Sequence, residues 1–237
     1  MSDKWKEIWS TRDLANPEKI ELENLIYANG FDNGVGSYSS KTWRKMVADF
    51  CKRIRFIEPQ NILEIGCGSG AFIYAANEIM DVNWYGVDYS RTLIDIAKRA
   101  IPSGHFIDDE AVKQNFSNTS FDCVFSHSVF HYFPDEKYAN EVLENWCAKL
   151  NKNGLLLLLD VNDADHEEYY HKERAKDYHN TNSYAEAYKD LNHLFFKKER
   201  ITALLDGLGM SEIEFFPHAI SEYGNSKFRF NLICKKT

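Results

Sequence analysis

Three glycines at alternate positions are the first feature of this sequence that points to chemistry. Gly66, Gly68 and Gly70 follow a short apolar run and come just before a stretch of helical periodicity. Glycine lets the backbone approach a ligand closely and permits positive φ. In an open α/β sheet, ligands bind beyond the carboxyl ends of the strands. The glycines therefore predict a loop that binds a dinucleotide or another adenosine-bearing cofactor, with a simple tight turn as the alternative.

Acidic side chains follow the next two apolar runs. Asp88 closes the second run, and Asp108 and Asp109 follow the third. A carboxylate at the end of the second strand can bind a ribose diol, a role that NAD and S-adenosylmethionine share. The aspartate pair lies at the edge where the amino group of an adenine could be held. Asp88 alone therefore fits either cofactor.

The exact spacing separates the two cofactors. The run from Gly66 to Ala71 formally fits the dinucleotide fingerprint, which accepts alanine at its third small position. Glu64 stands two residues before the first glycine, however, and the third glycine is at 70 rather than 71. Together with the aspartate pair after the third run, these features favour S-adenosylmethionine.

The elements that must position these residues alternate along the chain. Short apolar runs predict strands over 61–65, 84–87, 104–107, 121–125 and 155–159, with helices over 71–80, 91–101 and 134–150 between them, the last ended by Gly154. Strands that alternate with helices predict a parallel α/β sheet. A helix over 198–208 and strands over 211–216 and 227–234 close the chain. The first sixty residues are expected to be helical and rich in loops, with Ser39 or Ser40 capping one helix.

Composition excludes several classes of protein. The net charge is −8 without a long basic run, which argues against nucleic acid as a partner. The five cysteines form no C-x-x-C pair, so the spacing for zinc is absent, and no other ligand set for a metal stands out. The longest apolar run, 155–159, is too short to span a membrane. We expect a cytoplasmic protein with reduced thiols.

Beyond these patterns, the sequence resembles a known family. The stretches Ile62-Leu-Glu-Ile-Gly-Cys-Gly-Ser-Gly70, Tyr85-Gly-Val-Asp-Tyr-Ser90 and Phe121-Asp-Cys-Val-Phe-Ser-His-Ser-Val-Phe-His-Tyr-Phe-Pro-Asp135 are similar to the motifs of class I S-adenosylmethionine-dependent methyltransferases. The resemblance covers roughly residues 55–237. It implies a Rossmann-like sheet of seven mostly parallel strands, with helices on both faces and an antiparallel last strand. It also implies S-adenosylmethionine as cofactor and S-adenosylhomocysteine as product.

The resemblance assigns the cofactor to a set of residues along the first four strands and ahead of them. The set comprises Tyr38, Trp43, Glu64, Gly66, Cys67, Gly68, Gly70, Asp88, Tyr89, Asp108, Asp109, Ser126 and His127. Within it, Asp88 would accept hydrogen bonds from the ribose, and Tyr89 would lie against the adenine. Asp108 or Asp109 would receive the adenine amino group, with Asp108 preferred as nearer the strand end.

The remaining members of this set would surround the methionine part of the cofactor. The glycines would pass beneath it, with Glu64 organising their loop, and Ser126 and His127 would flank it. Tyr38 and Trp43 lie where the family folds an N-terminal segment over the cofactor, although both could equally be core aromatic residues. We expect one domain over 1–237, with 1–55 as a helical lid and 161–196 as an insertion on the acceptor side.

Methyl transfer from a sulfonium is a direct displacement, so holding the acceptor close and in line can supply much of the catalysis. A hydroxyl acceptor also needs a general base, whereas a neutral amine needs less help. The candidate bases are His131, His127, His193 and Asp160. Each also has a structural reading, since a histidine can pack within its loop and an aspartate can cap a turn.

The insertion is rich in aromatic and histidine side chains: Tyr169, Tyr170, His171, Tyr178, His179, Tyr184, Tyr188 and His193. Such side chains suit a polar, ring-bearing acceptor such as a sugar, while an amphipathic lid helix is the plain alternative. The sequence thus predicts a small-molecule methyltransferase, monomeric or homodimeric, that methylates an oxygen of a sugar, a surface-polysaccharide precursor or another metabolite.

Three other functions stay open from the sequence. A small-molecule N-methyltransferase would use the same cofactor loop. A nicotinamide-dependent oxidoreductase would share the glycines and Asp88. A non-catalytic protein on the same fold is a further possibility, because fold does not fix function. Its expected sign is a damaged cofactor loop, and here Glu64 and all three glycines are present.

Overall fold

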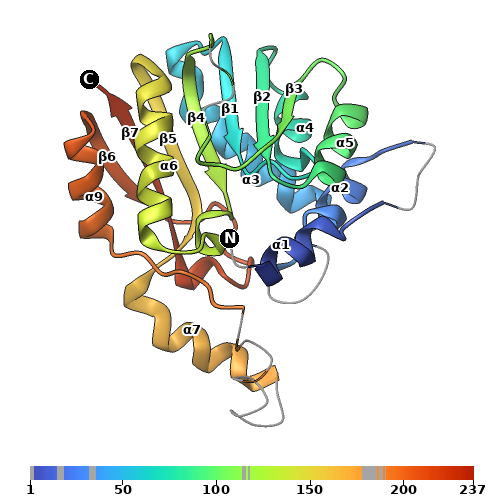
Figure 1. The fold of residues 1–237 in the computed structure, drawn as a ribbon, viewed down its shortest axis with the longest axis vertical. Coiled ribbons are helices and arrows are strands. Elements are labelled where there is room, and N and C mark those ends of the chain that lie inside the picture. The colour runs from blue at the N-terminus through green and yellow to red at the C-terminus, as the bar shows by residue number, and fades with distance from the viewer. Residues whose placement is uncertain are drawn as a thin grey trace.

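The computed structural model describes residues 3–14, 19–31, 36–113, 116, 118–177, 186, 189 and 191–237. Its centre is a seven-stranded sheet in the order β3-β2-β1-β4-β5-β7-β6 (Figure 1). The strands are β1 Asn61–Ile65, β2 Asn83–Asp88, β3 His105–Asp108, β4 Phe121–His127, β5 Leu150–Asn162, β6 Met210–Phe216 and β7 Arg229–Lys236. Strands β1 to β5 pair in parallel, and β7 runs antiparallel between β5 and β6. The predicted fold class is confirmed.

Helices cover both faces of the sheet in the part of the chain that the structure describes. They are α1 Asp3–Ser10, α2 Leu22–Ala28, α3 Ser40–Ile54, α4 Ala71–Asn77, α5 Arg91–Ala100, α6 Glu136–Lys149, α7 Glu167–Arg174 and α9 Lys198–Gly207. Short 3₁₀ turns occur at η2 Arg55–Ile57, η3 Phe130–Tyr132, η4 Ala164–His166, η5 Ala175–Asp177 and η6 Ser226–Phe228. Three helices start at side-chain caps, since Ser39, Ser90 and Asp135 each accept a hydrogen bond from the backbone three residues on.

Two hydrophobic cores lie on the opposite faces of the sheet. In the run 155–159 of β5, the odd-numbered leucines belong to one core and the even-numbered leucines to the other. The first core contains Trp43 and Phe72 from α3 and α4, and the second contains Trp146 from α6. Figure 1 shows α6 covering one face near β4 and β5, with α3 and α4 behind the sheet. A strand covered on both faces must be apolar throughout, as this run is.

The region around Gly154 differs from the prediction. Helix α6 ends at Lys149, and β5 begins at Leu150 and passes through Gly154, which therefore does not end the helix. A Cβ at this position would lie 2.9 Å from the carbonyl oxygen of Asn151 and 3.1 Å from that of Asp122. The glycine is needed because two backbone segments come close together here, a strand role of glycine that looks like a helix stop in the sequence.

The N-terminal helices pack against the carboxyl edge of the sheet. From α1, the Lys6 ammonium lies 2.6 Å from the Glu110 carboxylate, beyond the end of β3. The indole of Trp5 stacks on His193 of the insertion, with ring centroids 5.1 Å apart. Helix α1 thus contacts both the segment that follows β3 and the insertion at 161–196. Tyr178, His179, Tyr184 and Tyr188 of the insertion lie outside the described residues.

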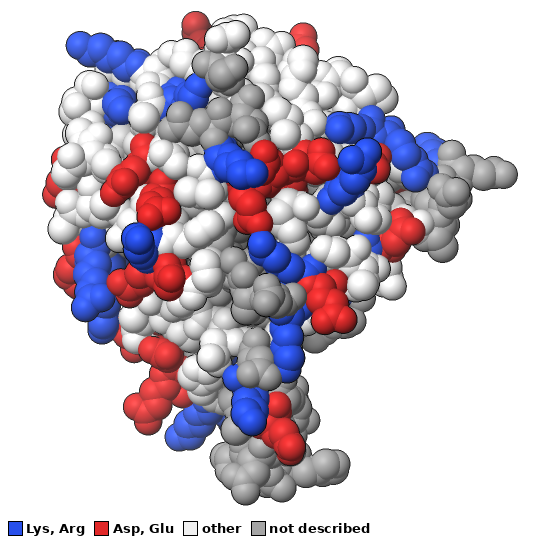
Figure 2. Space-filling model, viewed as in Figure 1, with Lys and Arg blue, Asp and Glu red and all other residues white. Residues whose placement is uncertain are grey.

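The charged side chains form no large region of one sign on the face drawn in Figure 2, where acidic and basic groups are interspersed. The helices that the structure describes are all too short or too polar to cross a bilayer.

Candidate active site

The glycine loop after β1 leaves no room for a side chain at positions 66 and 68. Gly66 and Gly68 have φ of 73° and 52°, in the left-handed region. A Cβ on Gly66 would lie 2.4 Å from Cγ2 of Val129, and one on Gly68 would lie 2.4 Å from Oδ1 of Asn29. The loop is tied to β2, because the backbone N–H groups of residues 66 and 67 both donate to the carbonyl of Val87. Both glycines are therefore required by conformation and by space.

Asp88 lies at the end of β2 and faces this loop. Its carboxylate accepts hydrogen bonds from the backbone N–H of Gly68 at 3.0 Å and of Ser90 at 2.9 Å. Burial raises the pKa of Asp88 to about 6, although the two backbone donors act in the opposite direction. These donors fix the orientation of the carboxylate. Each of its oxygens keeps a further lone pair that can accept a hydrogen bond from a ligand.

Glu64 of β1 is a buried acid beside Asp88. Only 3% of the residue is exposed, and its Oε2 atom has no hydrogen-bond partner among the described residues. Burial, together with the nearby Asp88, raises the pKa of Glu64 well above its ordinary value. An unpartnered buried carboxyl oxygen costs free energy unless something binds it. Because Glu64 lines the same cavity as Asp88, this oxygen is a candidate for binding a ligand.

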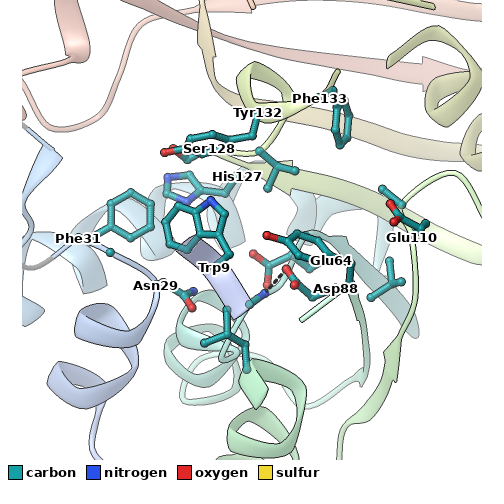
Figure 3. Close-up of a pocket in the computed structure, with 18 of the residues that line it drawn as sticks. Trp9, Asn29, Phe31, Glu64, Asp88, Glu110, His127, Ser128, Tyr132 and Phe133 are labelled. Atoms are coloured by element: carbon teal, nitrogen blue, oxygen red, sulfur yellow. Dashed lines mark hydrogen bonds between the residues drawn. The ribbon is translucent and has the colours of Figure 1, made fainter. Parts of the chain in front are cut away.

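These groups line a cavity of about 910 Å³, a volume that includes its open mouth (Figure 3). The lining residues are Trp9, Asn29, Gly30, Phe31, Trp43, Glu64, Gly66, Gly68, Val87, Asp88, Tyr89, Leu93, Glu110, Ala111, His127, Ser128, Val129, Tyr132, Phe133 and Tyr138. In Figure 3, Glu64 and Asp88 lie between Phe31 at one side and Glu110 at the other. The cavity thus presents carboxylates along its length and aromatic rings around them.

At the end of β3, the acidic residue that lines the cavity is Glu110. Asp108 and Asp109 are not among the lining residues; they lie 3.7 Å from Arg91 and 2.7 Å from Lys113. Burial would raise the pKa of Glu110, but Lys6 and the hydroxyl of Tyr138 outweigh it and lower this pKa. The acidic run 108–110 was visible in the sequence, but which of its members faces inward depends on the turn after the strand.

His127 and Ser126 end β4 and have different surroundings. The hydroxyl of Ser126 donates to the carbonyl of Ile65 at 3.0 Å, and Ser126 does not line the cavity. His127 does line it, packed against Phe31 and Trp43. The Nε2 atom of His127 is buried without a partner among the described residues. Burial lowers the pKa of His127 to about 4, so its ring is neutral at neutral pH.

The other predicted cofactor residues divide between the cavity and the core around it. Trp43 lines the cavity and donates from Nε1 to the carbonyl of Ala71. Tyr89 also lines it, and its hydroxyl donates to the carbonyl of Trp5. Tyr38 stacks on Tyr223 with ring centroids 4.4 Å apart and does not line the cavity. Cys67 is fully buried inside the loop, and Gly70 caps the start of α4.

Two of the predicted bases lie behind the cavity wall. His131 has no exposed surface, and neither of its ring nitrogens has a hydrogen-bond partner among the described residues. His193 has its Nδ1 atom 2.8 Å from the hydroxyl of Tyr170. Burial lowers the pKa of both histidines well below the ordinary value. Neither one lines the cavity, whereas His127 does.

Asp160, the fourth predicted base, belongs to a buried charge network. The residue has no exposed surface, and its carboxylate pairs with the guanidinium of Arg229. The hydroxyl of Tyr223 donates to Oδ2 of Asp160 at 3.1 Å, and Arg229 also donates to Oγ of Ser128 at 3.2 Å. Burial acts to raise the pKa of Asp160, but Arg229 and His218 outweigh it and hold this pKa well below its ordinary value.

Several residues of the site could not be inferred from the motifs. Trp9, Asn29 and Phe31 come from the N-terminal helices and the turn after them, and Arg229 and His218 come from the last two strands and their connection. No spacing rule links them to the glycine loop. Among the residues that the structure describes, no three histidine, cysteine or acidic side chains come together as a metal site.

Comparisons with known proteins agree with this geometry. Residues 62–154 match the family described as methyltransferase domain. The chain is 25% identical over 202 residues to phosphoethanolamine N-methyltransferase 1 of Arabidopsis thaliana, covering 78% of this chain and 40% of that protein. It is 26% identical over 145 residues to demethylmenaquinone methyltransferase of Thermotoga maritima, covering 61% of this chain and 57% of that protein. The chain thus spans about half the length of these curated relatives.

A solved structure gives the same picture of the fold. The S-adenosylmethionine-bound amino pentose methyltransferase CalS10 from Micromonospora echinaspora superposes with a TM-score of 0.62 at 12% identity, covering 94% of this chain and 99% of that chain. This likeness is one of fold. The family match over residues 62–154, with the strand order, identifies a class I S-adenosylmethionine-dependent methyltransferase domain in the chain. The cofactor of such a domain is S-adenosylmethionine, as the motifs predicted.

Proposed function

We propose that this protein transfers a methyl group from S-adenosylmethionine to a small molecule. The observation that carries the proposal is the paired site of Asp88 and Glu64 beside a loop that admits only glycine at 66 and 68. The fit is specific, because the unpartnered Oε2 of Glu64 suits the methionine ammonium and the anchored carboxylate of Asp88 suits a ribose diol. When bound, S-adenosylmethionine supplies an electrophilic methyl group on a sulfonium.

The adenine end of the site follows from the same cavity. Tyr89 and Tyr138 offer rings there, and Glu110 offers the carboxylate that lines the cavity beyond β3. We therefore assign the adenine amino group to the region of Glu110, with Asp108 and Asp109 outside the lining. Phe31 lies on the side of the cavity away from Glu110 (Figure 3), and it and Trp9 offer apolar surface against which an acceptor can be positioned.

His127 is the group that we assign to the acceptor's proton. It lines the cavity, its ring is neutral at neutral pH, and its Nε2 atom is free to accept a hydrogen bond. A general base must come within hydrogen-bond reach of the proton that it takes. Among the four candidates named from the sequence, His127 is the one that lines the cavity.

We further propose an oxygen acceptor, a hydroxyl of a sugar, of a surface-polysaccharide precursor or of another polar metabolite. A neutral histidine and the hydroxyl of Ser128 next to it in the cavity lining support this choice, because both can hydrogen-bond to hydroxyls. The second candidate is an amine acceptor. It is favoured by the aromatic rings of Trp9, Phe31 and Tyr132, which can hold a cationic amine. A cytoplasmic location and a monomeric or homodimeric state stay predictions of the sequence.

Replacing Asp88 by alanine should weaken the binding of S-adenosylhomocysteine about 10- to 100-fold. The reason is that one hydrogen bond to a charged group contributes roughly 1.5–3 kcal/mol, and about 1.4 kcal/mol corresponds to a tenfold change in affinity. Isothermal titration calorimetry measures the effect directly. Asp108→Ala is the matched control, since it removes a neighbouring carboxylate that does not line the cavity, and its affinity should be that of the unmodified protein. Equal weakening in both variants would contradict the assignment of the ribose to Asp88.

A screen of acceptors then decides between oxygen and nitrogen. Purified protein is incubated with methyl-labelled S-adenosylmethionine and panels of sugars, sugar nucleotides and small amines, and the labelled products are identified by mass spectrometry. A methyl ether supports the first candidate and a methylamine the second. Cofactor binding without transfer to any panel member would favour a non-catalytic protein.

A further inference from the structure

A second, smaller cavity lies beside the cofactor cavity. It has a volume of about 310 Å³, a figure that includes its open mouth, and it is lined by Met46, Asp49, Phe50, Arg53, His127, Leu159, Phe216, His218, Ala219 and Asn231. These residues come mainly from α3 on one side and from β6, β7 and the segment after β6 on the other. His127 lines both cavities, so a single imidazole ring borders each of them.

His218 is the second histidine of this smaller cavity. Its side chain is 3% exposed, and its Nε2 atom lies 2.9 Å from Oδ1 of Asp160. Asp160 is itself fixed by Arg229 and Tyr223. His218 thus lines the small cavity and has one ring nitrogen facing a buried carboxylate. The pair has the arrangement of a histidine oriented by a buried acid.

One ring nitrogen at the junction of the two cavities is unpartnered. Nε2 of His127 is buried without a hydrogen-bond partner among the described residues, whereas Nε2 of His218 and Oδ1 of Asp160 lie 2.9 Å from each other. A buried polar atom without a protein partner is normally satisfied by water. A water that bridges two imidazoles is a path along which a proton can move.

We propose that His218, oriented by Asp160, carries away through this second cavity the proton that His127 takes from the acceptor. The inference rests on the proposed methyl transfer and holds for a hydroxyl or an amine acceptor. Because burial keeps the ring of His127 neutral, this histidine needs a neighbour to which a proton can pass. His218 is the titratable group that shares the cavity with it and has a carboxylate behind it.

The proton balance is simple. As the acceptor's oxygen or nitrogen forms its bond to the methyl carbon, the carbon–sulfur bond breaks, and its electron pair stays on sulfur. The acceptor's proton moves to the imidazole of His127, then through water in the second cavity to His218, and finally to solvent. Nothing is oxidised or reduced, and the released proton accounts for the positive charge lost by the sulfonium.

Charged side chains from α3, β5 and β7 lie around the second cavity. On α3, Asp49 and Arg53 form an ion pair at 2.8 Å, and both side chains are about a third exposed. Arg53 also lies over the ring of Phe216, 3.8 Å from its centroid. On β5 and β7, Asp160 and Arg229 nearly compensate each other's charge. The partly exposed pair of Asp49 and Arg53 marks the side on which the route meets solvent.

The proposal is tested by the exchange of the His127 ring proton with solvent. We would label the histidine rings with ¹⁵N, add S-adenosylhomocysteine, and measure exchange by saturation transfer. His218→Gln keeps an amide that can contact Asp160 but cannot take up and release a proton, so exchange at His127 should slow about tenfold or more. His166→Gln is the matched control, because His166 also pairs with an aspartate after β5, Asp163, but lines neither cavity. The control should exchange as the unmodified protein does.

A second readout uses turnover with the acceptor found in the screen. His218→Gln should lower kcat about tenfold, leave the affinity for S-adenosylhomocysteine unchanged, and move the pH dependence of kcat. Unchanged exchange in His218→Gln would overturn the proposal, whatever the turnover. Failure of the proposed function looks different, since the unmodified protein would then bind no S-adenosylhomocysteine or would methylate no acceptor in the screen. His218→Asn repeats the measurement should the first variant fail to fold.

Discussion

Replacing Arg229 by leucine should lower the free energy of unfolding by about 3–5 kcal/mol, because it leaves a buried carboxylate without its main counter-charge. The guanidinium of Arg229 is 3% exposed, and the carboxylate of Asp160 has no exposed surface. Arg229 also donates to Ser128 and Tyr223, so two further partners lose a hydrogen bond. The lost charge pair and the lost hydrogen bonds together should make this variant less stable than any other that we propose.

Denaturant unfolding monitored by tryptophan fluorescence measures this loss. The matched control is Arg91→Leu. The side chain of Arg91 is 79% exposed and lies 3.7 Å from Asp108. An exposed pair contributes about 0–1 kcal/mol, so the control should unfold close to the unmodified protein. The double variant Arg229→Leu with Asp160→Leu should recover much of the lost stability, since it removes both charges. Similar midpoints for Arg229→Leu and Arg91→Leu would show that the buried pair is not formed.

His131→Leu should protect the protein from acid. The folded protein holds the pKa of His131 well below the ordinary value, chiefly through burial, while the unfolded chain titrates near 6.5. Below pH 6.5 the unfolded state therefore binds more protons than the folded state, and stability falls as the pH falls. The variant lacks this contribution. It should gain about 1.4 kcal/mol relative to the unmodified protein between pH 7.5 and pH 5.5.

The measurement is the difference in unfolding free energy between the two proteins at both pH values. The other buried histidines are present in both proteins, so their contributions cancel in the comparison. His166→Leu is the control, because the side chain of His166 is 46% exposed, and it should not gain stability as the pH falls. Equal pH dependence in the unmodified protein and in His131→Leu would mean that His131 is protonated in the fold.

Much of the fold could be predicted because the hydrophobic pattern of each segment matches the way that segment packs in the sheet. The apolar run 155–159 is buried on both faces, and the strands and helices after Asn61 appear in the predicted order. Gly154 was misassigned because a glycine that permits a close backbone approach looks the same in sequence as a glycine that ends a helix. Spatial proximity of β4 and β5 decides its role, and the sequence around it does not contain that information.

In the candidate site, too, the residues that are close in sequence were predicted together, and contacts between distant segments were not. The glycine loop and Asp88 are local to one β-α-β unit, and the structure brings them together in one cavity. The sequence predicted Asp108 or Asp109 for the site after β3, whereas the acidic residue that lines the cavity there is Glu110. Asp160 was named without its partners. His218 and Arg229 reach it from segments more than fifty residues away, by pairing of β5 with β7 that no motif records.

The cavity at the carboxyl edge of the sheet is assigned to S-adenosylmethionine, and every proposed role depends on that assignment. Calorimetric titration of the purified protein with S-adenosylmethionine and S-adenosylhomocysteine, with NADH as the control ligand, tests it most directly. We predict that the first two bind with one site per chain and that NADH gives no heat of binding. Binding of NADH alone would contradict the assignment, and the loop at Gly66 to Gly70 would then have to be a dinucleotide site.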